Sequence, residues 1–245
     1  MKQFLFPVFL SATLLSTNSC FEFTTSQQEP KGPLTKESRH MQNINTITTS
    51  MGITTEYHQN DSLSLQIEAP EDIIYYVRTQ FIDSSLVIDF SKQLNLRNTK
   101  VHIKVTAPTV TNFLASSGSN IYIPKGINSH NRDIIINTSS GAEVEIKGNN
   151  NAENISLLSS SGSEITIDSL SAESLNAAAS SGSDINIAGT CNSVNLTASS
   201  GSKISAAKFY VRSGTAAASS GAEISCKIEK PTTINKSSGG SVKNK

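Results

Sequence analysis

Apolar and polar residues alternate over most of the chain from residue 100 to residue 230, and the same order returns about every 20 positions. Positions can be counted from the glycine of each Ser-Ser-Gly triplet. Isoleucine or valine then stands at position +3 of six successive repeats: Ile121, Val144, Ile165, Ile185, Ile204 and Ile224. Positions +5, −5 and −7 are also mostly apolar. Side chains two residues apart lie on the same face of a strand, so the pattern predicts stacked strands that share one buried side.

The Ser-Ser-Gly triplet occurs seven times, at intervals of 18 to 23 residues. We expect its glycines to make the turns of the repeat: Gly118, Gly141, Gly162, Gly182, Gly201, Gly221 and Gly239. A sharp bend between strands needs positive φ, which glycine adopts at low cost. In this prediction the second serine of each triplet faces the narrow interior of the corner, and the first serine belongs to an outward ladder. A nucleophile is needed only once, so seven copies favour architecture over catalysis.

A near-fixed period of this length is the signature of a stacked repeat protein. We therefore predict an all-β fold, a single-stranded parallel β-helix (solenoid) with about 20 residues per coil. The crossover rule for parallel strands favours a right-handed helix. The predicted β-helix domain spans residues 44–245. Within it, residues 44–108 form irregular N-terminal coils that cap the open end, and residues 109–245 form the Ser-Ser-Gly coils.

The first 19 residues resemble a secretory signal peptide, because a short apolar run (Phe4 to Leu15) follows an early lysine and is too short to span a membrane. A cysteine directly after such a run resembles a bacterial lipoprotein signal, which makes Cys20 the predicted lipidation site. Leucine three residues before the cysteine is usual in these signals, and this chain has Thr17 there. Simple cleavage therefore remains the alternative. Residues 20–43 are polar and are predicted to form a flexible tether.

These features occur in a recognisable order. A lipoprotein-like start is followed by IEAP (Ile67 to Pro70), by VHIKVTAP (Val101 to Pro108), and then by repeated Ala-Ser-Ser-Gly-Ser-x-Ile-x-Ile. Over about residues 45–240 this order resembles the putative auto-transporter adhesin, head GIN domain family. The resemblance implies a secreted bacterial protein with an adhesin-like role, and it supplies no catalytic residues.

The candidate chemistry is sparse. Acidic residues recur at position +2 and would stack as an outward acidic ladder at strand spacing: Glu143, Glu164, Asp184 and Glu223. Like charges at that spacing repel, so the ladder could bind a cation. Alternatively it is a solvated face, relieved by Lys203. HExxH, CxxC and the calcium-binding nonapeptide repeat are absent, so we expect no metal, no cofactor and no catalytic residue.

Charge and cysteine usage narrow the functional classes. The chain has 20 basic and 20 acidic residues and no basic block, which disfavours nucleic acid as a partner. Cys191 and Cys226 occupy different points of the repeat, two repeats apart, so we expect two free thiols.

The leading hypothesis is a non-enzymatic β-solenoid lipoprotein of the cell envelope. It would be secreted across the inner membrane and anchored to the outer membrane by an N-terminal lipid, facing the periplasm or the cell surface. Its ligand would be a glycan or a protein. The alternatives are a carbohydrate-active enzyme that uses carboxylates such as Glu143 and Glu164, and a structural or sensory envelope protein. The sequence does not fix the oligomeric state.

Overall fold

The computed structural model describes residues 29–92, 96, 98–129 and 132–245. Within these residues the secondary structure is almost entirely strand. The elements in chain order are β1 (Leu34–Arg39), β2 (Thr46–Thr49), β3 (Thr54–Gln59), β4 (Ser64–Pro70), the 3-10 helix η1 (Ile74–Tyr76), β5 (Val77–Ile82), β6 (Ser85–Phe90), β7 (His102–Ala107), β8 (Asn112–Ala115), β9 (Asn120–Ile123), β10 (Ile134–Thr138), β11 (Glu143–Ser159), β12 (Glu164–Ala179), β13 (Asp184–Ala198), β14 (Lys203–Ala218), β15 (Glu223–Lys236) and β16 (Ser241–Asn244).

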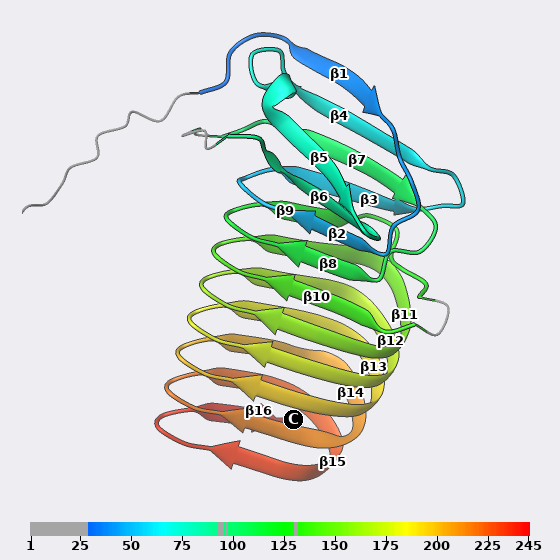
Figure 1. The fold of residues 1–245 in the computed structure, drawn as a ribbon. Coiled ribbons are helices and arrows are strands. Elements are labelled where there is room, and N and C mark those ends of the chain that lie inside the picture. The colour runs from blue at the N-terminus through cyan, green and yellow to red at the C-terminus, as the bar shows by residue number, and fades with distance from the viewer. Residues whose placement is uncertain (1–28, 93–95, 97, 130–131) are drawn as a thin grey trace, which may run out of the picture.

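The strands stack as a β-solenoid of about seven turns with roughly 20 residues per turn (Figure 1). From β11 onward each long strand covers most of one coil and pairs in parallel with the next coil. Equivalent repeat positions lie opposite each other, as Val144 does with Ile165, and Ile165 with Ile185. The predicted parallel β-helix is therefore confirmed, while its handedness stays a prediction.

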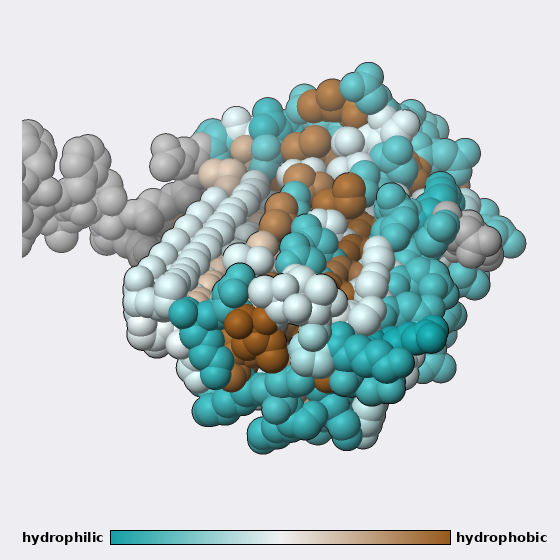
Figure 2. Space-filling model, turned by 90° about the horizontal axis from the view of Figure 1, so that it is seen from below, coloured by the Kyte–Doolittle hydropathy of each residue, from teal (hydrophilic) through white to brown (hydrophobic). Residues whose placement is uncertain are grey.

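The interior is a column of stacked apolar side chains. Ile165, Ile185 and Ile204 at position +3 are all buried, as the alternation predicts. Alanine occupies position −3 in most coils, and Ala179 and Ala198 are buried there too. Seen from the C-terminal end, stacked like residues form continuous rows, near-white along one edge and brown beside them (Figure 2).

The Ser-Ser-Gly corner differs from the prediction in one respect. Both central residues of the turn are left-handed, with φ of 53° at Ser181 and 70° at Gly182, the conformation of a type I′ turn. Two such residues point the tip outward, so the second serine is exposed instead of facing the interior. The residue after the glycine fills the corner: Ser183 is buried, and its Oγ donates to the carbonyl of Ser159 (2.7 Å) and accepts from the amide of Ser180 (3.1 Å).

These corners also link successive coils. The amide of Gly182 donates to the carbonyl of Ser200 one coil further on (3.0 Å), and the same bond recurs at the other stacked corners. The first coil has an eighth corner that the triplet search missed. Met51 and Gly52 adopt φ of 62° and 73°, and the amide of Gly52 donates to the carbonyl of Ser117 (3.0 Å).

The N-terminal coils are built out of sequence order. The coil made by β6 and β7 lies above the coil made by β2 and β3, although it comes later in the chain. Above it, β5 pairs antiparallel with β6, and β4 pairs antiparallel with β7 and β1. The end of the solenoid is thereby covered by antiparallel strands (Figure 1).

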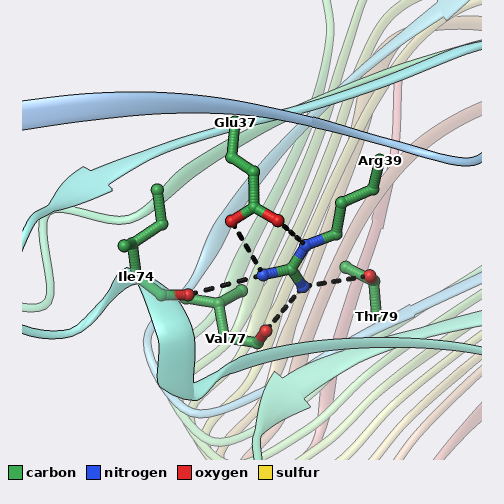
Figure 3. A network of polar contacts seen from close by, with 5 residues as sticks. All are labelled: Glu37, Arg39, Ile74, Val77 and Thr79. Atoms are coloured by element: carbon green, nitrogen blue, oxygen red, sulfur yellow. Dashed lines mark hydrogen bonds and ion pairs between the residues drawn. The ribbon is translucent and has the colours of Figure 1, made fainter.

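The expected tether of residues 20–43 is wrong over its last part. Leu34–Arg39 form β1, the edge strand of the cap. Arg39 fixes this strand to β5: its guanidinium donates to the carbonyl of Val77 (2.6 Å) and to Oγ1 of Thr79 (3.1 Å), and it is paired with Glu37 (2.9 Å) (Figure 3). Pairing with β4 and the hydrogen bonds of Arg39 therefore order the segment Leu34–Arg39, although its sequence is mostly polar.

The predicted signal peptide and Cys20 lie outside the described residues. Among the residues that are described, no helix has the length and apolar character needed to cross a membrane.

Candidate functional site

A groove of about 540 Å³ runs along the outward face of β2, β8 and β10 and the C-terminal parts of β11 to β13, and we call it the front groove. Its floor is built from position −4 of successive coils and consists of Thr48, Leu114, Asn137, Leu158, Ala178 and Thr197. Leu158 is 44% exposed, so an apolar side chain reaches solvent in the middle of this floor. Because the floor is apolar at Leu114, Leu158 and Ala178 and polar at the other three positions, we call it the apolar track after its leucines.

One edge of the front groove is the ladder formed by the first serine of each triplet. Ser116, Ser139, Ser160, Ser180 and Ser199 line the groove. The backbone of these residues is fixed from inside, as in the bond from the Ser180 amide to Ser183 Oγ. The coils repeat at the strand spacing of about 4.8 Å, so the hydroxyls form a regular row along the solenoid axis.

A mostly polar row flanks the other side of the apolar track at position −6, and it consists of Asn112, Ile135, Ser156, Asn176, Asn195 and Thr215. Asn195 Nδ2 donates to Oδ1 of Asn176 (3.1 Å), and Oγ1 of Thr215 donates to Oδ1 of Asn195 (2.7 Å). These side chains border a second hollow of about 500 Å³, which also contains Ile135. The front face thus carries three parallel rows: serine hydroxyls, the apolar track, and a polar row in which Asn176, Asn195 and Thr215 are hydrogen-bonded to one another.

The acidic ladder lies on the opposite face of the coils. Glu143, Glu164 and Asp184 occupy facing positions on β11, β12 and β13, followed by Lys203 and Glu223. Partial burial and the nearby carboxylates of Glu164 and Glu145 raise the pKa of Glu143.

Local partners already engage parts of this ladder. Asn186 Nδ2 donates to Oε1 of Glu164 (2.8 Å), and Lys243 pairs with Glu223 (2.7 Å). Among the described residues, no group of three or more His, Cys, Asp or Glu side chains is placed to hold a metal ion. Cation binding by the ladder stays a prediction, as does its use by a partner.

The two cysteines are free, as predicted. Both are buried, and burial raises the pKa of the Cys191 and Cys226 thiols. Because thiolates are the reactive form, both side chains behave as small core residues.

Sequence reasoning missed the front groove. Its floor comes from position −4, where leucine, asparagine, alanine and threonine alternate between coils. No single repeat stands out there. Comparing that one outward position across all coils would have shown Leu114 and Leu158 on a face that the strand alternation assigns to solvent.

Comparison with known proteins agrees with the fold. The family model described as "Putative auto-transporter adhesin, head GIN domain" matches residues 43–144 and 134–245. The crystal structure of a "Putative lipid binding protein" from Parabacteroides distasonis ATCC 8503 has a TM-score of 0.78 at 18% identity, covering 89% of this chain and 100% of that one.

Two further solved structures share the fold. A putative adhesin from Parabacteroides merdae ATCC 43184 has a TM-score of 0.74 at 18% identity, covering 89% of this chain and 99% of that one. A putative adhesin from Bacteroides fragilis NCTC 9343 has a TM-score of 0.65 at 20% identity, covering 89% and 100%. No curated protein matches the chain. The two matches to the family model together span most of the sequence, and the chain therefore belongs to the putative auto-transporter adhesin, head GIN domain family.

Proposed function

We propose that this chain is a secreted, non-enzymatic binding protein of the adhesin type and that it holds an extended ligand in the front groove. The observation that carries the proposal is the groove itself, in which the apolar track with its exposed Leu158 lies between a row of hydroxyls and a row that contains hydrogen-bonded asparagines. Membership of an adhesin family, together with a fold shared with two putative adhesins, supports a binding role over catalysis.

The chemistry of the groove favours a carbohydrate chain. Sugar rings present apolar C–H faces and polar edges, which match a track containing Leu114 and Leu158 flanked by Ser180 and Asn176. Each coil would contribute a weak contact, and repetition along the solenoid would raise the overall affinity. An envelope polysaccharide or a host glycan is therefore the proposed ligand class.

Anchoring is the second part of the proposal. Lipidation of Cys20 would attach the chain to the outer membrane and place the solenoid in the periplasm or at the cell surface. Mass spectrometry of the mature N-terminus tests this part: a diacylglycerol-modified Cys20 supports it, and an unmodified N-terminus refutes it.

Glycan arrays and polysaccharide pull-downs test the ligand class. The natural protein should retain one or more polysaccharides, and Leu158→Asp should lose at least tenfold in affinity, because it places a charge on the apolar track. Asp184→Asn, on the opposite face, is the matched control and should bind normally. Binding that is lost in the control but kept in Leu158→Asp would contradict the assignment. New reducing ends or unsaturated products on incubation would instead support the carbohydrate-active enzyme.

A lipid chain is the second candidate ligand, because the floor of the groove is partly aliphatic and one solved neighbour is described as a "Putative lipid binding protein". Displacement of a fluorescent fatty acid would distinguish the two candidates. Saturable displacement that is abolished by Leu158→Asp, with no retention of polysaccharide, would favour the lipid.

A further inference from the structure

The chain carries equal numbers of acidic and basic residues, but the two kinds are concentrated in different coils of the solenoid. Residues 133–199 contain eight acidic residues and one basic residue, whereas residues 200–245 contain eight basic and two acidic residues. The middle coils are therefore strongly negative and the C-terminal coils strongly positive. The acidic ladder supplies only three of the eight acidic residues of the middle coils, and the front groove is lined by none of them.

The separation is sharpest on the side of the solenoid that joins its two faces, which we call the third side. It consists of residues 147–154 of β11, 168–174 of β12, 188–193 of β13, 207–213 of β14 and 227–230 of β15, which bend together at the right of Figure 1.

One column on this side runs through successive coils as Glu153, Glu173, Asn192, Arg212 and Glu229. The strand pairs on either side of these residues fix that order. All five side chains are exposed. The central coil contributes no charged residue, so the third side has a net negative charge above β13 and a net positive charge below it.

The two halves also differ in shape. The acidic half contains a hollow of about 410 Å³ lined by Asn151, Ala152, Glu153, Ser171 and Glu173, among others. The basic half carries Tyr210, a large aromatic side chain that is 57% exposed, with the Lys227 ammonium 4.4 Å from its ring centroid. A projecting aromatic with basic neighbours thus lies two coils from a hollow bordered by two carboxylates.

We propose that the third side is a homodimer interface, in which a second copy packs antiparallel across β13. A twofold axis along the β13 strand would place the coils of the second copy in the reverse order. Each column of one copy would then face the same column of the other copy. Glu173 of each copy would then face Arg212 of the other, and Tyr210 with Lys227 would face the hollow. Such an interface is self-complementary, as a twofold dimer requires. In the same geometry Glu153 of each copy would face Glu229 of the other, and Lys227 and Lys230, which flank Glu229 on β15, would offset this like-charge contact.

The size of the surface sets the expected strength. Five strands about 4.8 Å apart and about seven residues wide cover about 500 Å² per molecule. Stable interfaces typically bury about 800 Å² per partner. The dimer should therefore be weak, with a Kd of about 10–100 µM. Because exposed ion pairs contribute much of its attraction, it should dissociate in about 1 M salt, where the screening length is about 3 Å.

Sedimentation equilibrium of the purified protein tests the proposal. We expect a concentration-dependent monomer–dimer equilibrium at low salt. Glu173→Arg and Arg212→Glu should each raise the dimer Kd at least tenfold, because each places like charges opposite one another. An equimolar mixture of the two variants should recover association, because both facing pairs become Arg–Glu again. The double variant in one chain should also recover it.

Tyr210→Ala should weaken association without changing the thermal melt. Glu71→Arg and Lys31→Glu change the net charge equally at exposed positions of the cap, and as matched controls they should associate like the natural protein. A protein that stays monomeric at every concentration in low salt would overturn the proposal. So would single charge reversals that weaken association but do not recover it when mixed.

Discussion

Two glycines of β13 and its preceding corner should respond differently to alanine, because the backbone needs each for a different reason. Gly182 lies at the corner with φ of 70°, and a Cβ added there would meet no atom within 4 Å. Alanine at this position is therefore disfavoured only by the left-handed backbone conformation, so Gly182→Ala should lower the free energy of unfolding by about 1 kcal/mol. Gly189 has φ of 126°, and its Cβ would lie 2.0 Å from the carbonyl oxygen and 2.5 Å from the amide nitrogen of Leu170 in the neighbouring coil.

Gly189→Ala must therefore push β13 away from β12, in addition to its backbone strain. We expect it to cost about 3–5 kcal/mol, in the range of severe single substitutions. Urea titrations followed by far-UV circular dichroism would compare the two variants with the natural protein. Equal losses, or a larger loss for Gly182→Ala, would refute the idea that close coil-to-coil approach requires Gly189 and that the exposed corner requires only positive φ.

Three further predictions concern charge, the cap and the thiols. Burial and nearby carboxylates raise the pKa of Glu143, so the stability contributed by its protonated form is lost as the pH rises through that pKa. Glu143→Gln should therefore raise the melting temperature by about 1 °C at pH 7 and leave it unchanged below about pH 4. Glu145→Gln is the control, and it should not raise the melting temperature because it removes an ion pair with Lys147. Arg39→Met should lower stability by about 1.5–3 kcal/mol and speed hydrogen exchange in β5, because it removes charged hydrogen bonds to β5; unchanged exchange there would contradict this role. The buried thiols of Cys191 and Cys226 should resist a thiol reagent in the native protein and react after unfolding, and rapid native labelling of either would show that its coil opens.

The coil interior could be predicted because stacking repeats one environment. Each inward position meets its own equivalent above and below, so Ile165, Ile185 and Ile204 preserve the same character. Period and alternation together are therefore enough to predict the parallel β-helix. The same repeat numbering places Cys191 and Cys226 at different points of the coil, two repeats apart, which is why they could be predicted to be unpaired.

The features that escaped prediction depend on contacts between unlike segments. β1 was assigned to the tether because its partners on β4 lie far along the chain, as Pro70 does from Leu34. The outward tilt of Ser181 follows from two consecutive left-handed residues, whereas the prediction gave positive φ to the glycine alone. The eighth corner escaped because Met51 replaces the second serine.

The candidate site was missed for a related reason. A groove on a solenoid is made by one outward residue from each of several coils, so no contiguous motif encodes it. Leu114 and Leu158 are 44 positions apart in the sequence, yet both line the front groove. The charge separation on the third side likewise becomes visible only when residues are sorted by coil.

Hydrogen exchange of the protein with and without a polysaccharide that the pull-down retains tests the central claim most directly. Binding in the front groove predicts slower exchange at the ends of β11, β12 and β13, around Leu158, Ala178 and Thr197, with no change at the beginnings of the same strands. Protection confined to those beginnings, around Glu143, Glu164 and Asp184, would place the ligand on the acidic ladder and contradict the assignment of the front groove.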